Sequence, residues 1–198
     1  MRLKVFTAPA AEPVSSTEAK SQCRISISDD DTLITSLIKT ARTDVELMTR
    51  RALITQTWDG YLDEFPGEDS LEIPLPPLQS ITSIKYTTSD GVEHTFASAS
   101  YYVDTISEPG RVVLNEGYSW PGDELRAANG VAIRFVCGYG ASSSYVPEPV
   151  RQAMLLLIGH YYENREASSL GNDLNLIPRG VDELLGNYRI FDYAGEDD

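Results

Sequence analysis

Few residues in this sequence could do chemistry. His160 and Glu163 are three positions apart, which places both on one side of a helix, where they could supply two metal ligands. No third ligand follows at a suitable spacing, so we expect His160 to be a partly buried or interface residue. The other histidine, His94, has no acid or nucleophile marked out beside it, and we expect it at the surface. The sequence therefore predicts no metal centre and no cofactor.

Two further patterns resemble parts of known ligand-binding loops but lack the other residues that such loops need. The run Asp29-Asp30-Asp31 lacks the alternating loop, the glycine and the final glutamate of a calcium site. We expect these carboxylates to cap the next helix and to interact favourably with its dipole. Gly138-Tyr139-Gly140 is followed neither by Lys-Ser/Thr nor by a third glycine, so it is no phosphate or dinucleotide loop. We expect it to end a strand.

A hydrolase that uses paired carboxylates would need inward-facing acids with separated pKa values. The acidic residues here gather instead at predicted helix starts and in predicted loops. We therefore expect a protein that is not an enzyme.

Composition narrows the class of protein further. The 198 residues suit one domain, or one domain with a sizeable insertion, and 41% hydrophobic residues are enough for a core. The net charge of −14 repels a phosphate backbone, which disfavours sequence-independent gripping of nucleic acid. Cys23 and Cys137 are too few and too far apart for a disulfide framework, and we expect ordinary buried thiols.

No targeting segment is predicted. The apolar part of Met1–Ala10 is too short for an export signal, and the longest apolar run, 153–159, is too short to span a bilayer. We expect a protein that has no membrane partner and stays in the bacterial cytoplasm until it joins its assembly.

The periodicity of apolar residues predicts helices at both ends of the chain. Ser16 or Thr17 should cap a short helix that ends near Cys23. A long amphipathic helix is predicted over 31–51, another helix over 150–165, and a short last helix over 181–188. Residues 1–13 show no periodicity and are predicted to form an extended arm.

Between the helices the pattern changes to period two with turn residues. The sequence predicts hairpins at Asp90-Gly91 and at Pro109-Gly110. The predicted strands cover 55–62, 71–75, 81–87, 92–96, 101–104, 111–114 and 131–137.

The helix over 150–165 is apolar on more than one side. Val150, Ala153, Leu157 and their helical neighbours make one apolar face, and Leu155 and Leu156 widen it beyond what one core needs. Either the helix is wrapped by its own sheet, or it packs on its own domain and also on a neighbouring subunit. The pattern alone leaves both possibilities open.

Eight short motifs, in this order, resemble those of the head-tail connector (adaptor) proteins of long-tailed phages, prophages and gene transfer agents. The resemblance runs from about Pro13 to Phe191. The motifs are 13–15 (PVS), 18–20 (EAK), 29–34 (DDDTLI), 51–58 (RALITQTW), 76–81 (PPLQSI), 138–140 (GYG), 146–153 (VPEPVRQA) and 159–165 (GHYYENR).

The helical and strand patterns together predict an α+β fold with extended N- and C-terminal arms. The resemblance implies that its helices form a small bundle, the connector core, and that the antiparallel β region is an insertion between the core helices. The division expected is 1–53 for the N-terminal arm and core helices, 54–145 for the β insertion, and 146–198 for a core helix, short C-terminal helix and tail. The family's smaller members are purely helical, so the role of the insertion is not implied.

The resemblance also implies a function. Such a protein forms a ring, usually of twelve subunits, beneath the portal and above a stopper or tail-completion protein. DNA passes through the ring during packaging and ejection, so the expected location is the head-tail junction of a virion or virus-like particle. The expected partners are therefore further copies of the chain, the portal, the stopper and duplex DNA in transit.

Two groups of residues are predicted to make these contacts. The subunit interface is predicted to include Arg151, Leu155, Leu156 and Tyr162. The C-terminal segment carries more apolar surface than water favours, and the resemblance implies the portal as its host. The residues predicted for the portal-binding tail are Arg179, Leu184, Leu185, Tyr188, Arg189, Ile190, Phe191 and Tyr193.

An alternative reading is a monomeric β-rich module that binds protein or carbohydrate. Trp58, Tyr101, Tyr102 and Trp120 could then be platform residues, although such aromatic side chains belong more often to a core.

Overall fold

The computed structural model of the chain describes residues 1–164 and 178–190. It contains helices and antiparallel sheets, which confirms the α+β class. The chain forms two compact units. We call 1–10 with 54–141 the β unit, and 11–53 with 142–198 the helical unit. The first ten residues thus belong with the β region and not with the helices that follow them.

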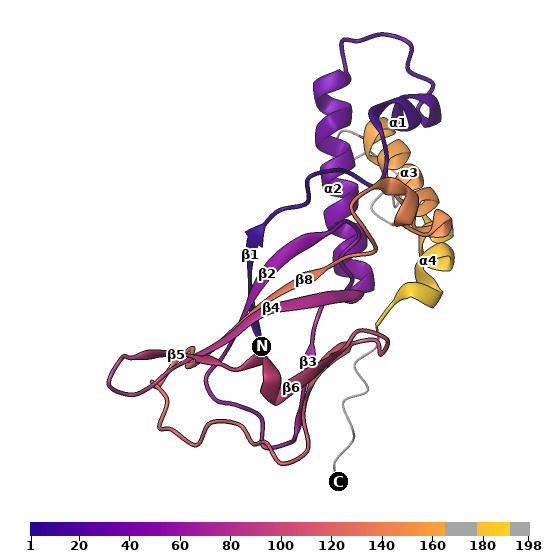
Figure 1. Ribbon diagram of the computed structural model, residues 1–198. Helices are drawn as coiled ribbons and strands as arrows, with labels where there is room; N and C mark the ends of the chain where they lie inside the picture. The colour runs from indigo at the N-terminus through magenta and orange to yellow at the C-terminus, as the bar shows by residue number, and fades with distance from the viewer. Residues whose placement is uncertain (165–177, 191–198) are drawn as a thin grey trace. The chain divides into compact units, whose positions relative to one another are not determined.

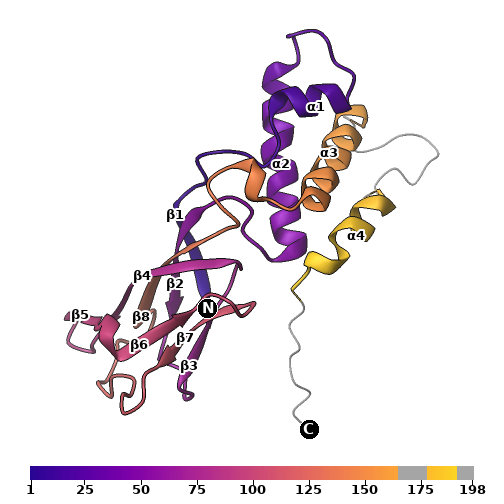
Figure 2. The same cartoon turned by 45° about the vertical axis from the view of Figure 1, so that its right-hand side comes forward.

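The described part of the helical unit contains α1 (Ser16–Gln22), α2 (Asp31–Thr49), α3 (Glu148–Glu163) and α4 (Arg179–Leu185). α2 and α3 lie side by side, and α1 and α4 pack on this pair (Figures 1 and 2). A short 3-10 turn at Ser143–Tyr145 precedes α3, and another at Gly186–Tyr188 follows α4.

The cap of α1 is Ser15, one residue before the predicted position. The Ser15 hydroxyl accepts a hydrogen bond from the Glu18 backbone, and the Glu18 carboxylate accepts one from the Ser15 backbone. This reciprocal pair satisfies two backbone donors that a helix start leaves free.

α2 is amphipathic as predicted, with its buried side chains three or four residues apart: Ile34, Ile38, Ala41, Val45 and Thr49. It ends at Arg50, whose φ of 55° is left-handed. The predicted capping by the aspartate run is wrong, because Asp30 at the N-cap makes no side-chain cap bond. Tyr162 and Lys20 bind Asp30 and Asp31 instead, so these carboxylates join α2 to α3 and α1.

The β unit holds two antiparallel sheets. The five-stranded sheet has the order β1 (Arg2–Thr7), β2 (Gln56–Leu62), β8 (Val131–Cys137), β4 (Leu78–Thr87), β5 (Glu93–Phe96). The three-stranded sheet has the order β3 (Ser70–Ile73), β7 (Gly110–Leu114), β6 (Tyr101–Asp104), with a 3-10 turn at Ser98–Ser100 before β6. All seven strands predicted between the helices are present.

Strand β1 was not predicted. The segment expected to be a free arm pairs antiparallel with β2, with Leu3 opposite Gly60 and Val5 opposite Trp58. Gly60 leaves the space that the Met1 side chain occupies, since an added Cβ would lie 2.5 Å from Met1 Sδ. The arm is therefore an edge strand of the five-stranded sheet.

The core of the β unit lies between the inner faces of its sheets. Ile84, Ile133 and Phe135 of the larger sheet are completely buried, as is Val112 of the smaller one. An added Cβ on Gly110 of β7 would lie 2.5 Å from Leu78 Cβ of β4, so the sheets approach closely there. The predicted hairpin at Asp90-Gly91 is confirmed, and Gly91 has the φ of 88° that favours glycine.

Candidate subunit and partner interfaces

Helix α3 buries one face within its own unit. Val150, Ala153, Met154, Leu157 and Ile158 have no exposed side-chain surface that a partner could reach. Leu155 and Leu156 lie beside this face and are only half-buried. The surplus of apolar surface predicted from the sequence is therefore present on the helix.

The two half-buried leucines have different surroundings. Leu156 Cδ1 lies 3.6 Å from where a Cβ on Gly180 of α4 would be, so this side chain contacts α4. Leu155 lines an open hollow of about 630 Å³ with α1 and the residues after it: Thr17, Glu18, Ser21, Gln22 and Arg24. Of the two, Leu155 is the more available to a neighbouring protein.

Arg151 uses its donors inside the helical unit. Its Nε donates to the Pro13 carbonyl oxygen at 3.0 Å, and its terminal nitrogens bind the Glu148 and Glu18 carboxylates. The hydrogen bonds that Glu18 accepts from Ser15, with a smaller contribution from Arg151, lower the Glu18 pKa. Arg151 thus braces the segment before α1 against α3.

The two tyrosines near the end of α3 both bind carboxylates. Tyr162 Oη donates to Asp30 Oδ2 at 2.5 Å, and Tyr161 Oη donates to Asp44 Oδ2 at 2.8 Å. Burial, followed by the hydrogen bond to Asp44, raises the pKa of Tyr161 to about 12. Tyr162, predicted at the subunit interface, joins α3 to the residue that precedes α2.

One side of α4 is buried in the helical unit and the other side is exposed or half-buried. Val181 and Leu185 are completely buried in the helical unit, while the Arg179 side chain is 95% exposed. Leu184 and Tyr188 are half-buried. The surface that α4 offers to a partner is therefore made by Arg179, Leu184 and Tyr188, without Leu185.

The residues after α4 are hydrogen-bonded to the end of α2 and to Arg51 just beyond it. Ile190 N donates to Thr49 O at 3.1 Å, and Arg51 Nε donates to Tyr188 O at 2.6 Å. Arg189 binds Asp182 at 2.6 Å. Phe191 and Tyr193 lie outside the described residues. Portal binding through this segment stays a prediction.

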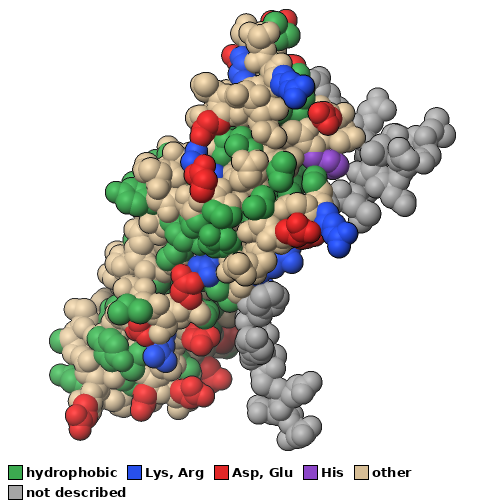
Figure 3. Space-filling model, turned by 90° about the vertical axis from the view of Figure 1, so that its right-hand side faces the viewer, with side chains coloured by type: hydrophobic (Ala, Val, Ile, Leu, Met, Phe, Trp, Pro, Cys, Tyr) green, Lys and Arg blue, Asp and Glu red, His purple; other side chains and the backbone are tan. Residues whose placement is uncertain are grey.

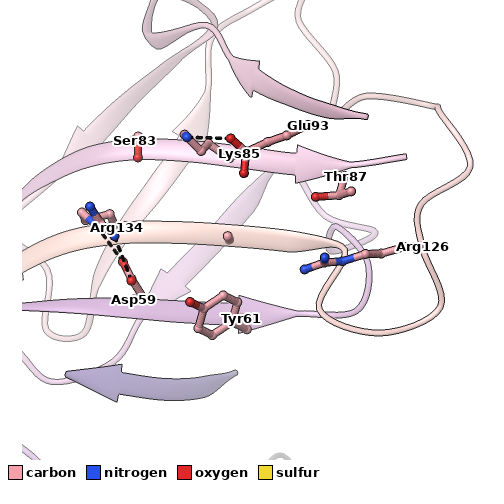
Figure 4. A pocket seen from close by; sticks show the side chains of 9 residues that line it. Asp59, Tyr61, Ser83, Lys85, Thr87, Glu93, Arg126 and Arg134 are labelled. Atoms are coloured by element: carbon pink, nitrogen blue, oxygen red, sulfur yellow. Dashed lines mark hydrogen bonds and ion pairs between the residues drawn. The ribbon is translucent and has the colours of Figure 1, made fainter. Parts of the chain in front are cut away.

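The β unit has a polar hollow that sequence reasoning missed. It measures about 330 Å³ and lies on the outer face of the five-stranded sheet, where alternate side chains of neighbouring strands point the same way (Figure 4). Arg134 binds Asp59 through two bonds of 2.7 and 3.0 Å, and Lys85 binds Glu93 at 2.7 Å. These hydrogen bonds to Asp59 raise the pKa of Arg134. The charges of the hollow are thus largely matched within the chain.

Basic residues are paired elsewhere too. More than half of the 16 Lys and Arg residues form ion pairs with carboxylates of the same chain: Arg2, Lys20, Arg42, Lys85, Arg111, Arg134, Arg151, Arg179 and Arg189. Figure 3 shows Lys and Arg interspersed with Asp and Glu on one face. No basic stripe crosses that face.

The histidines and cysteines occupy ordinary positions. His160 is half-buried, with Nδ1 3.3 Å from Asn164 Nδ2, and His94 stacks on Tyr86. Neither cysteine forms a disulfide; Cys137 is buried, as expected, and Cys23 is only half-buried. Among residues 1–164 and 178–190, no group of three or more His, Cys, Asp or Glu side chains could hold a metal ion. Within the same ranges, no helix has the length and hydropathy to cross a membrane.

Most of the aromatic residues on which the alternative of a β-rich binding module depends do not form an exposed platform. Tyr101 is buried and stacks on Phe96, and Trp120 stacks on Phe65 at 5.1 Å between ring centroids. Trp58 is half-buried. Tyr102 alone among the four is exposed, so they do not form one aromatic surface.

Comparisons with known proteins agree on the kind of protein. The sequence profile of the family described as phage gp6-like head-tail connector protein matches residues 17–106. This stretch begins within α1 and includes α2 and the strands from β2 to β6, so the match extends well into the β unit. No curated protein matches the chain.

Three solved structures share the fold over 98% of both chains. They are the neck of an empty gene transfer agent particle computed with C6 symmetry (24% identity, TM-score 0.82), the virion of a native gene transfer agent particle (24%, 0.81) and the neck of a native particle computed with C12 symmetry (25%, 0.74). The predicted resemblance to head-tail connectors is confirmed. Together with the family profile, the neck structures support a structural connector role and not an enzymatic one.

Proposed function

We propose that this connector-type protein forms a closed ring beneath the portal, joins the capsid to a stopper or tail, and lets duplex DNA pass through its lumen. The observation that carries the proposal is the likeness, over 98% of both chains, to a protein in a particle neck computed with C12 symmetry. The ring assembles in the bacterial cytoplasm and then resides at the head-tail junction.

The half-buried leucines of α3 supply part of the lateral contact. Association favours apolar side chains that one subunit cannot bury alone, and Leu155 beside its open hollow is such a side chain. Leu156 and Tyr162 flank it on the same helix, while Arg151 holds the adjoining segment in place.

The C-terminal segment is the proposed contact with the portal. The Arg179 side chain is available to a partner, because it is 95% exposed and its ion pair to Glu183 is 3.8 Å long. Leu184 and Tyr188 add apolar surface next to it. Phe191 and Tyr193 continue the same segment.

DNA passes the ring without being held. Twelve copies at −14 each carry about −170 formal charges, and the paired cations leave little for a phosphate backbone. Repulsion between such a wall and the duplex reaches about 8 Å at physiological salt. The lumen therefore acts as a conduit.

Truncation tests the portal contact. A chain that ends after Ile190 keeps the bonds from Arg51 to Tyr188 and from Ile190 to Thr49, whereas a chain that ends after Gly186 loses them. We expect the chain ending at Ile190 to fold and to bind portal protein more weakly, because it keeps Arg179, Leu184 and Tyr188 but lacks Phe191 and Tyr193, and the chain ending at Gly186 to lose co-purification. If both truncated chains still bind portal, another segment such as β1 makes the contact and the proposed role of the C-terminus is overturned.

A further inference from the structure

We propose that neighbouring copies of the chain join edge to edge through β1 and β5, so that the five-stranded sheet continues from one subunit into the next. The inference rests on the proposed ring and names a contact within it. The partner surface is a second copy of this chain.

Both edges of the sheet are open. In the order β1-β2-β8-β4-β5, the outer sides of β1 and β5 pair with no other strand of the described chain. Unpaired backbone N–H and C=O groups on a strand edge are a template for another strand. Because the edges are different strands of one sheet, joining them makes a head-to-tail contact, which is the kind that closes into a ring.

The side chains at the edges continue one apolar row. Pairing across the sheet connects Leu3 to Gly60, Gly60 to Ile133, Ile133 to Ile84, and Ile84 to Phe96. The middle of this row is completely buried, whereas Leu3 at its β1 end is 36% exposed. A neighbour's Phe96 placed beside Leu3 would extend the row and cover that surface.

Exposed apolar side chains flank the row at both edges. Met1 and Val5 lie on the same face as Leu3 and are 40% and 45% exposed. On the β5 side, Val92 is 48% exposed just before the strand. Burial of these side chains against each other stabilises the edge contact.

Charges on the two edges are complementary. The first eleven residues include Arg2 and Lys4 and no acid, and Lys4 forms no ion pair with the described residues. The stretch 88–97, which contains β5, includes Asp90 and Glu93 and neither Lys nor Arg. In Figure 4, Glu93 of β5 points toward Lys85, to which it is bound at 2.7 Å, on the polar face of the sheet; this face also bears Lys4 through its pairing with Asp59.

The direction of the strands fixes the geometry of the contact. Each of the four pairings in the sheet is antiparallel, so β1 and β5 run the same way. The new pairing is therefore parallel. Neighbouring strands lie about 4.8 Å apart, which is within the range of Cα separations that a disulfide can bridge.

An engineered disulfide tests this contact. Arg2 and Thr95 are exposed ends of the adjacent row, which runs through Tyr61, Ala132 and Lys85. The test variant is Arg2→Cys with Thr95→Cys in a Cys23→Ala background, with Cys137 left in place because it is buried. Lys4→Cys with Thr95→Cys covers a register shifted by two residues on the same face. The matched control, Glu72→Cys with Thr95→Cys, uses an exposed position on β3 of the other sheet.

Rings isolated by size are oxidised and run on a non-reducing gel. We expect one of the two test variants to give a ladder of covalent multimers that ends at the ring size, and the control to give none. Rings of normal size without a ladder from either variant overturn the edge contact and leave the ring proposal standing. Absence of rings from the parent chain, alone and with portal, overturns the ring proposal and this inference with it.

Discussion

Arg151 Nε on α3 donates a 3.0 Å hydrogen bond to the carbonyl oxygen of Pro13, 138 positions earlier in the chain. Glu18 and Glu148 bind the terminal nitrogens of the same guanidinium. The side chain therefore connects three segments of the helical unit. Through these bonds Arg151 positions the start of α1 beside Leu155, and its place in the subunit interface stays a prediction.

Removal of this brace should destabilise the helical unit. Arg151→Ala leaves the Pro13 carbonyl without its donor, and we expect the free energy of unfolding to fall by about 1–3 kcal/mol. Arg179→Ala is the control, because its side chain is 95% exposed and should change stability by less than about 0.5 kcal/mol. Urea denaturation measures both. Equal stability of the two variants would contradict the claim that Arg151 stabilises the helical unit.

Stability should fall at alkaline pH because of Tyr161. Its pKa is raised to about 12 in the folded chain, above the usual value of about 10 in the unfolded one. The folded state holds the phenol proton more tightly, so this contribution is complete below about pH 10 and is lost as the pH rises towards 12. We expect a smaller loss over this range for Tyr161→Phe than for the parent, measured by denaturation at a series of pH values. Tyr145→Phe, at an exposed position, should behave like the parent.

Charges on successive leucines of α3 should separate folding from assembly. Leu157→Asp puts a charge at a completely buried position and should prevent folding, at a cost of several kcal/mol. Leu155→Asp should give a folded chain, by circular dichroism, that no longer forms rings. Leu156→Asp should impair both, because Leu156 also contacts α4.

The control for this series is Leu47→Asp on α2, where the side chain is 72% exposed. That variant should fold and assemble. Normal rings from Leu155→Asp would show that α3 makes no lateral contact.

The free protein should not bind duplex DNA near physiological salt. Its charge of −14 and the pairing of its Arg and Lys side chains leave little attraction for phosphates. Fluorescence anisotropy of a labelled duplex, titrated with the protein over a range of salt concentrations, measures this. Binding that weakens steeply as salt rises would reveal a basic surface and contradict the proposal that DNA passes through the lumen without being held.

Local patterns predicted most of the elements. The spacing of Ile34, Ile38, Ala41 and Val45 predicts α2 because a buried helix face repeats every three or four residues. Asp90-Gly91 predicts the β4–β5 hairpin because glycine accepts a positive φ. These signals lie within a few residues of the structure that they specify.

Features that depend on distant partners were not predictable in this way. β1 has alternating Leu3 and Val5, but its strand identity comes from pairing with residues 57–61. Leu185 was predicted to contact a partner, but it is completely buried. Its burial comes from packing within the helical unit, which the local sequence does not show. The polar hollow is lined by Asp59, Lys85 and Arg134, which come from three different strands. No local sequence motif therefore indicates that these side chains lie together.

Electron microscopy of the purified protein, alone and bound to portal protein, tests the central claim most directly. We expect closed rings whose averaged end views show twelvefold symmetry, as in the neck structure computed with C12 symmetry, and a central channel. A protein that stays monomeric in both samples, with no ring density on the portal, would contradict the proposed connector ring.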